Sequence, residues 1–363
     1  MAIAGPSLAG NDSPASAASP ASAVSTLPVT RAQPRPLQVP KVVGRLDASQ
    51  LGLVINTADP YSIEVGEYYA KRRRLGGAQI LRMDLPMNEQ LTPIEFEVLR
   101  ERIERQFGPE IQAVALAWNA PWAVDCNSLT GALTLGLDKA LCQQSCGRTR
   151  PSAYFNSRSA RPWTDHGMRL SMLLAAGTVE QGKALVDRGL ASEGSLGLRG
   201  APAVTALFVT SDDLARNVRS ILYPPQSISS RGGVDIEVIP IRALQSRQNL
   251  VMVQAGSAKI PALETLGWVP GALADHLTSF GGVLSYRHGQ TMAIDWIRSG
   301  VTATYGIVSE PCNHLQKFPH PQALLLHYLQ GQTAVEAYWK SVLWPQQGLF
   351  VGDPLAAPFS RAR

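Results

Sequence analysis

The chain has 363 residues, a length that suits two ordinary domains or one large two-lobed domain. Hydrophobic residues make up 45% and charged residues 17%, and every apolar run is far shorter than a bilayer crossing needs. This predicts a globular body with no integral membrane segment. The net charge of +5 is mild, and its basic run, Lys71–Arg74, falls on an expected helix without interleaved aromatic residues. A solvated helix face is therefore expected, and no nucleic-acid partner.

Residues 1–47 consist mainly of Ala, Ser, Pro, Gly and Thr, with almost no large apolar side chains. Such a segment cannot offset its ordering entropy, which predicts a disordered tail. It shows no basic start followed by an apolar core, so no signal peptide is visible in it. A cytoplasmic location and a signal lost through start-site choice both stay open.

A first α/β lobe is expected over residues 48–200, beginning with a buried strand over 51–57. The segment 58–61 predicts a turn, after which Ser62 is expected to cap a helix running from 63 to about 74. A second strand is expected over 79–83. The alternation of strand and helix favours a parallel sheet.

The next helix has strong local signals: Thr92 is placed to cap it, Pro93 takes its first position, and Glu95 completes a capping box. A strand over 111–118 follows, and then a long irregular excursion over 119–169. Thr178 is expected to cap a helix to about residue 190. The glycine-rich loop 193–200 is interpreted as the join to a second lobe.

The second lobe is expected over residues 201–363 and shows the same alternation of strands and helices. A helix capped by Ser211 is expected after its first strand, and a late helix capped by Thr333 with Glu336. The remaining expected elements are strands over 203–210, 234–241, 250–254 and 302–308, and helices over 290–298 and 321–329. The predicted fold class is thus a two-lobed α/β structure with mainly parallel sheets flanked by helices.

Four cysteines, Cys126, Cys142, Cys146 and Cys312, permit three pairings if oxidised, and the sequence leaves the pairing open. Cys142 and Cys146 are four residues apart and would share one face of a helix. This spacing is not that of a zinc knuckle, and no second pair follows it. Structural thiols or one or two disulfides are expected.

Three stretches of the second lobe carry a resemblance. Leu250–Ser257 and Leu273–Ser279 read as successive strands followed by turns, and Val351–Pro354 ends in Gly-Asp-Pro. This order resembles the gingipain-type cysteine peptidases of the caspase–haemoglobinase fold, in which one strand ends in His-Gly and the next in Ala-Cys. The segment 53–62 and the strand before Asn119 look like the matching first lobe.

Most of residues 51–359 also resembles a bacterial family of uncharacterised, often exported proteins. The recurring phrases stand here as Asn56–Ser62, Thr278–Gly282, Glu310–Cys312 and Gly352–Leu355. This resemblance implies a periplasmic or extracellular location.

The departures from the peptidase pattern decide the expected chemistry. A thiol peptidase needs a thiolate within hydrogen-bond reach of an imidazole. Here Ala255 stands at the histidine position and His276 at about the cysteine position, with no thiol nearby. Peptidase activity by that mechanism is not expected.

Polar residues follow most of the expected strands, and parallel strands place such residues at one edge of a sheet. A catalytic set drawn from this edge consists of Asp275, His276, Ser279, Glu310 and Cys312, because carboxylates beside an imidazole can do general acid–base work. A binding set is expected beside it: Asp59, Asn119, Trp122, Asp125, Asp212 and His314. Trp118, Trp122 and Trp163 are candidates to line a pocket for a sugar or peptide, or to pack in the core.

Other readings of the same residues stay open. Asp275 and Glu310 could cap the elements that follow them. Cys312 could be a nucleophile with His276 as its base. Cys312, His314 and His320 are ligands that zinc accepts, although their spacing is irregular, so a zinc site is a minor alternative and no cofactor is expected.

These observations predict a non-catalytic, pseudopeptidase-like bacterial protein that binds a peptide or envelope protein partner in a cleft at the carboxyl edge of the sheet. The alternative is a hydrolase with an unconventional catalytic set drawn from the Asp, His, Ser, Glu and Cys residues named above.

Overall fold

The computed structural model describes residues 2, 44–196, 203–228, 233–285 and 289–361. The tail expected to be disordered lies outside the described residues, apart from Ala2 and 44–47. The expected join over 193–200 is described only to residue 196.

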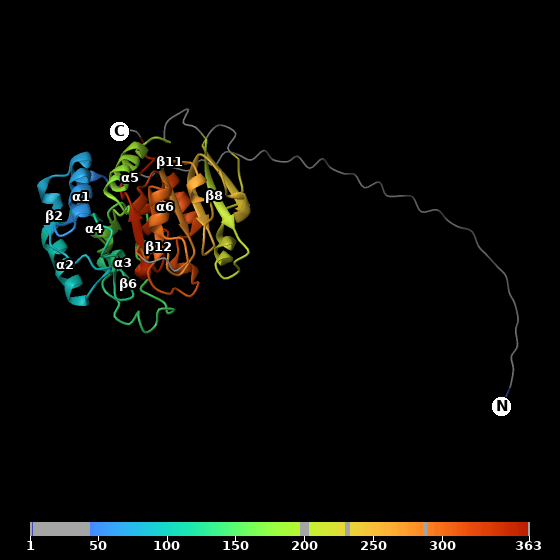
Figure 1. The fold of residues 1–363 in the computed structure, drawn as a ribbon, viewed down its shortest axis with the longest axis horizontal. Helices are drawn as coiled ribbons and strands as arrows, with labels where there is room; N and C mark the ends of the chain where they lie inside the picture. The colour runs from blue at the N-terminus through green and yellow to red at the C-terminus, as the bar shows by residue number, and fades with distance from the viewer. Residues whose placement is uncertain (1, 3–43, 197–202, 229–232, 286–288, 362–363) are drawn as a thin grey trace. The chain divides into compact units, whose positions relative to one another are not determined.

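Ten strands form the main sheet, in the order β2-β1-β4-β7-β13-β12-β11-β10-β8-β9, and three short strands form a second sheet, β3-β5-β6. Figure 1 labels β2, β8, β11 and β12 of the main sheet. The strands are β1 (Leu51–Asn56), β2 (Ile80–Met83), β3 (Gln90–Leu91), β4 (Ala113–Leu116), β5 (Ala123–Val124), β6 (Asn127–Ser128), β7 (Leu170–Leu173), β8 (Val204–Thr210), β9 (Val234–Pro240), β10 (Leu250–Ala255), β11 (Trp268–His276), β12 (Ala303–Ile307) and β13 (Gly348–Gly352).

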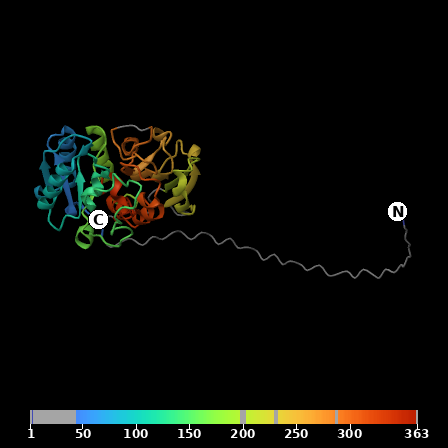
Figure 2. The ribbon, with the colours of Figure 1, turned by 90° about the horizontal axis from the view of Figure 1, so that it is seen from below.

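Helices flank the main sheet (Figure 2). The α-helices are α1 (Pro60–Arg73), α2 (Pro93–Gln106), α3 (Leu129–Leu135), α4 (Pro162–His166), α5 (Val179–Ser192), α6 (Ala293–Ser299), α7 (Pro321–Leu329) and α8 (Ala334–Trp339). The short 3-10 helices are η1 (Ala48–Gln50), η2 (Gly77–Gln79), η3 (Asn217–Leu222), η4 (Ile241–Ala243), η5 (Leu263–Thr265), η6 (Leu315–Lys317) and η7 (Pro345–Gln347). The expected α/β class with a mostly parallel, helix-flanked sheet is confirmed.

Strand β1 shows how both faces of the sheet are covered. Ile55 points at Gly66 of α1, where an added Cβ would come within 2.6 Å of the isoleucine side chain. Gly52 lies an odd number of residues away, so it faces the other side of the sheet, and there it meets the ring of Phe107 just after α2. Every residue of β1 is buried, which explains its continuous apolar run.

The pairing of β13 with β12 is antiparallel, whereas all other neighbours in the main sheet are parallel. Strands β2, β1, β4, β7 and β13 therefore run one way, and β12, β11, β10, β8 and β9 run the other way. The carboxyl ends of β8–β12 lie at the same edge as the amino ends of β4, β7 and β13. We call this edge the β12 carboxyl edge.

Strands from both expected lobes thus pair in one sheet, with β7 beside β13. The described elements all belong to one compact unit, Pro36–Arg363. The main sheet contains strands from both sides of residue 200. The division into two lobes at that residue stays a prediction.

Local signals placed several helices correctly. Thr92 and Thr333 each form a capping box, with Glu95 and Glu336 respectively, and Thr178 caps α5. Ser62 does not cap α1: Asp59 does, accepting a hydrogen bond from Tyr61 N at 2.9 Å. The Ser62 hydroxyl instead accepts one from Asn56 N at the end of β1.

The helix expected after Ser211 is also wrong. The Ser211 hydroxyl donates to the Gly256 carbonyl, and the segment turns until the 3-10 helix η3 begins at Asn217. Serine favours both helix caps and turns, and here a contact with the loop after β10 decides between them.

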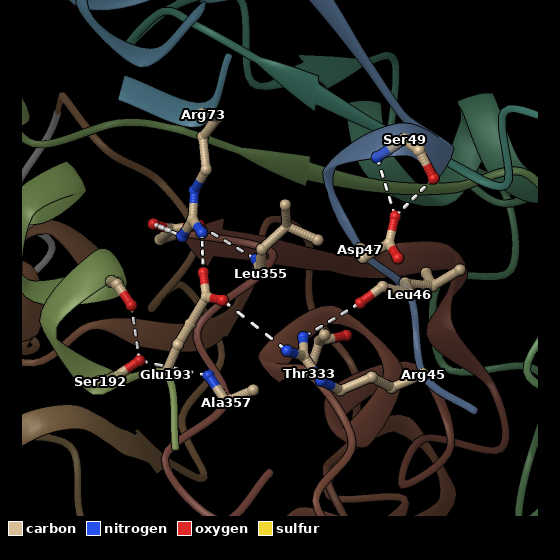
Figure 3. A network of polar contacts seen from close by, with 12 residues as sticks. Arg45, Leu46, Asp47, Ser49, Arg73, Ser192, Glu193, Thr333, Leu355 and Ala357 are labelled. Atoms are coloured by element: carbon tan, nitrogen blue, oxygen red, sulfur yellow. Dashed lines mark hydrogen bonds and ion pairs between the residues drawn. The ribbon is translucent and has the colours of Figure 1, made fainter. Parts of the chain in front are cut away.

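The Gly-Asp-Pro turn after β13 is an anchor of the fold. Asp353 is fully buried and accepts hydrogen bonds from Arg73 of α1 at 2.6 Å, from Tyr69 at 3.0 Å and from Leu355 N at 3.0 Å. Arg73 also pairs with Glu193, beyond α5 (Figure 3). Leu46 N and the Thr333 backbone N–H both donate to the side chain of Glu336. These contacts join the beginning, middle and end of the described chain.

Candidate functional site

The two positions that the peptidase resemblance singles out are neighbours in space. Ala255 ends β10, His276 ends β11, and the two are register partners in these adjacent parallel strands. Paired strands lie roughly 4.8 Å apart, so a functional dyad could be assembled at this point of the β12 carboxyl edge. Ala255 is fully buried, and its methyl group offers no proton transfer.

His276 is a core residue here. Its side chain is only 1% exposed, and Trp296 Nε1 of α6 donates a hydrogen bond to its Nδ1 at 3.0 Å. Because Nδ1 accepts, the proton of the neutral ring sits on Nε2. Burial, helped by the positive charge of Arg219, lowers the pKa of His276 to about 3. A neutral imidazole held inside the core cannot serve a substrate in solvent as a general base.

Asp275 is likewise buried inside the sheet and does not line the mouth of a crevice, contrary to expectation. It pairs with Arg219 of η3, and Gln254 of the neighbouring strand donates to its second carboxylate oxygen at 2.7 Å. Arg219 also donates to the Ala255 carbonyl at 2.9 Å. Burial raises the pKa of the Asp275 carboxyl, and the Arg219 guanidinium opposes that rise. The pair holds the carboxyl ends of β10 and β11 together.

The residues Arg219, Gln254 and Trp296, which hold Asp275 and His276, were missed by the sequence reasoning. Arg219 lies in a segment expected to be an ordinary helix, and an arginine there predicts solvent exposure. The one available signal was the acidic residue inside a buried strand, since a buried carboxylate requires a partner.

Cys312 forms a disulfide with Cys146, and Cys126 forms one with Cys142. This settles the pairing that the sequence left open and excludes Cys312 as a free nucleophile, since a disulfide sulfur is not a thiolate. It likewise removes Cys312 from the zinc alternative. Cys142 and Cys146 lie in turns and not on a helix, and each pairs with a cysteine outside this segment.

Glu310 and Ser279 lie in loops at the β12 carboxyl edge, both partly buried. Glu310 Oε1 accepts a hydrogen bond from Cys312 N at 2.8 Å, so the carboxylate orders the loop that carries the disulfide. This agrees with the capping interpretation of Glu310. Its neighbour Ser309 donates to the Cys126 carbonyl at 2.6 Å. This hydrogen bond joins the loop to the irregular segment 119–169.

Asp59 and Asn119 lie at the opposite edge of the sheet, contrary to the expectation of one shared crevice. Each follows the carboxyl end of a strand, β1 or β4, that runs against β10–β12. Asp59 caps α1, and Asn119 Oδ1 accepts hydrogen bonds from Ala176 N and Gly177 N at 3.0 Å. The reversal between β12 and β13 is the physical reason that these residues are separated from His276.

The other expected binding residues have mixed positions. Trp118 and Trp122 are buried, at 0% and 3% exposure, whereas Trp163 is half-buried and lines a pocket. Asp125 and Asp212 are exposed. His314 is partly buried and meets the ring of Trp344 edge-on. In the described ranges no three His, Cys, Asp or Glu side chains are grouped so as to hold a metal ion.

Exposed apolar side chains lie in the segment that leaves this edge of the sheet after β8. Leu214, Ile221 and Ile228, all between β8 and β9, are 82%, 77% and 80% exposed. Leu222, which follows Ile221 in the sequence, lines a pocket of about 260 Å³. The other lining residues are Phe155, Leu315, Gln316, Phe318, His320, Ser341 and Leu343. Gln322 of α7 donates to the Leu222 carbonyl at 3.1 Å and so joins the two walls.

No protein-family model and no curated protein sequence matches the chain. Three solved structures are similar to it. One described as a protease gives a TM-score of 0.46 at 10% identity, covering 86% of this chain and 78% of that chain. The Arg-specific cysteine proteinase gingipain R gives 0.44 at 13%, with coverages of 86% and 78%. The complex of the pro- and mature domains of RgpB from Porphyromonas gingivalis gives 0.42 at 12%, with 85% and 79%.

These similarities agree with the gingipain-like resemblance seen in the sequence, and they concern the arrangement of elements alone. Within the described ranges, no helix combines the length and apolar character that a bilayer crossing requires.

Proposed function

We propose that this chain is a non-catalytic, peptidase-like protein that binds an apolar segment of a peptide or protein partner at the β12 carboxyl edge. The observation that carries the proposal is the pair Ala255 and His276. They are register partners where a thiol–imidazole dyad would stand, and one is a methyl group while the other is buried against Trp296.

The binding role is supported by Leu214 and Ile221, which are exposed in the segment whose Arg219 contacts Asp275 and the Ala255 carbonyl. Exposed large apolar side chains that gather on one segment mark interaction sites more often than isolated ones do. A pocket of about 260 Å³ next to them suits one or two apolar side chains of a partner. Anchor side chains in such pockets carry much of the binding energy of peptide complexes.

The two disulfides support an oxidising compartment, periplasmic or extracellular, because thiols in the cytosol are kept reduced. A partner in the cell envelope or in the surrounding medium fits this setting.

The test begins with peptides selected by phage display on the purified full chain, followed by calorimetric titration of variants. Ile221→Ser and Leu214→Ser are expected to weaken the selected peptides about tenfold each, because each removes a buried apolar contact. Ile94→Ser is the matched control, since Ile94 is 79% exposed on α2. It should leave the affinity unchanged.

The same peptides are then incubated with the protein and weighed by mass spectrometry. Intact peptides that bind through Leu214 and Ile221 support the proposal. Cleaved peptides would establish the hydrolase alternative, and equal affinities for all three variants, or no selectable peptide, would overturn the binding site.

A further inference from the structure

A second pocket, of about 450 Å³, lies at the amino ends of β4 and β7. Its walls come from α2, from the end of α3, from residues 150–153 and from α4 with the turn after it. The apolar pocket described above is lined by Phe155, so the two pockets flank one segment of the excursion. Their lining residues are entirely different. The volume is that of a site for a small molecule of one or two rings.

One wall of this pocket is the indole of Trp163. The Arg169 guanidinium lies over the Trp163 ring, 4.2 Å from its centroid, without lining the pocket itself. Arg169 is buried and fixed by hydrogen bonds to the carbonyls of Ile111 at 3.0 Å, Phe107 at 3.0 Å and Gly108 at 3.1 Å. The Trp163 ring is therefore held by an immobile side chain, which makes it a rigid aromatic part of the lining.

The part of the lining that comes from α2 alternates donors and acceptors. Arg100 lies between Glu97 and Glu104, at 2.7 Å and 2.6 Å, and the three side chains are 35%, 45% and 48% exposed. Arg150, an exposed residue, donates from Nη1 to the Leu135 carbonyl at 3.1 Å, which orients its guanidinium at the rim. Two guanidinium groups and two carboxylates line the pocket together with the His166 imidazole, so its charges balance when that ring is neutral.

A ligand for this pocket needs an apolar ring face for Trp163 and several groups that both donate and accept hydrogen bonds. A charged ligand gains little, because the lining carries no net charge. Hydroxyl groups on a saturated ring have this combination of properties. We propose that this pocket binds a neutral saccharide, one or two residues long, with a C–H face on Trp163 and hydroxyls on Arg150, Arg100 and the two glutamates.

The experiment uses the full chain and a set of methyl glycosides of glucose, galactose, mannose and N-acetylglucosamine, with their disaccharides and methyl glucuronide. Saturation-transfer NMR finds the binders and calorimetry gives the affinities. Arg150→Ala is the main variant, because Arg150 is exposed and its loss should not affect folding. Arg148→Ala is the matched control, because Arg148 is exposed two residues away and does not line the pocket.

At least one neutral glycoside is expected to bind with a dissociation constant of about 1 mM or tighter, and the glucuronide no better than the glucoside. Arg150→Ala should weaken the binder about tenfold, the effect of losing one hydrogen bond from a charged group, while Arg148→Ala changes nothing. Trp163→Leu, checked for a native thermal midpoint, should abolish binding. The proposal is overturned if no neutral member binds with a dissociation constant of about 1 mM or tighter, or if folded Trp163→Leu and Arg150→Ala bind as the wild type does.

Discussion

Arg73 and Asp353 are 280 residues apart in the sequence, and Arg73 Nη2 donates to Asp353 Oδ2 at 2.6 Å with both side chains buried. The pair ties α1 to the turn that follows β13, the last strand. The Gly-Asp-Pro phrase of the sequence thus has a structural explanation that requires no catalytic role. An uncompensated charge at this place is costly, because neither partner can reach water.

Replacing Asp353 by Asn is therefore expected to lower the free energy of unfolding by about 3 kcal/mol or more, because the buried Arg73 guanidinium loses its fully buried charge partner and keeps only the partly exposed Glu193. The matched control is Asp187→Asn. Asp187 pairs at 3.0 Å with Arg72, which precedes Arg73 on α1. The side chains of Arg72 and Asp187 are 43% and 47% exposed. An exposed pair should cost less than about 1 kcal/mol. Urea denaturation of both variants is the measurement, and equal losses would contradict the anchoring role of Asp353.

His276 predicts a specific dependence of stability on pH. The imidazole binds a proton below about 6.5 in the unfolded chain, whereas burial holds its folded pKa at about 3. Between these values the unfolded state binds more protons, so stability falls on acidification by up to about 1.4 kcal/mol per pH unit and is fully kept above 6.5.

The wild type and His276→Asn should therefore differ in the slope of unfolding free energy against pH between about 6 and 4. His327→Asn is a useful comparison, because burial lowers the pKa of His327 to about 4 and its contribution ends at a higher pH. If the His276 ring proves to titrate near 6.5 by NMR, the imidazole is accessible to solvent and the core assignment is wrong.

The two disulfides should contribute unequally to stability. Cys146–Cys312 closes a separation of 166 residues and Cys126–Cys142 one of 16 residues. In the chain-entropy model the longer loop contributes about 5 kcal/mol and the shorter about 3 kcal/mol. Double Cys→Ser variants of each pair, unfolded in urea without reductant, test this order. A larger loss of unfolding free energy for the Cys126–Cys142 variant would show that contacts in the native state outweigh the entropy of loop closure in the unfolded chain.

The purified protein is expected to leave arginyl and lysyl peptide substrates uncut. Cleavage by a thiol peptidase requires a thiolate. Cys312, the cysteine that follows β12, is held in the disulfide with Cys146 and has no thiol. A chloromethyl ketone should leave the non-reduced protein unlabelled by mass spectrometry. Stoichiometric labelling at Cys312 that disappears in His276→Ala would restore the enzyme interpretation.

The local part of the fold could be predicted from the sequence. Thr92 with Glu95, Thr333 with Glu336, and Thr178 mark helix starts by contacts within one turn, and the structure contains these helices where they were expected. The absence of an imidazole at Ala255 was equally legible, because it depends on one residue's identity.

Only the tertiary structure decided where these elements point. The antiparallel pairing of β13 with β12 places Asp59 and Asn119 at the edge opposite His276. The residues of a strand do not determine whether the neighbouring strand runs parallel or antiparallel to it. The partner of a buried group is also non-local: Arg219 reaches Asp275 across 56 residues, and Cys146 reaches Cys312 across 166. Such pairings follow from the burial of charge and sulfur in the folded chain, so sequence spacing alone could not assign them.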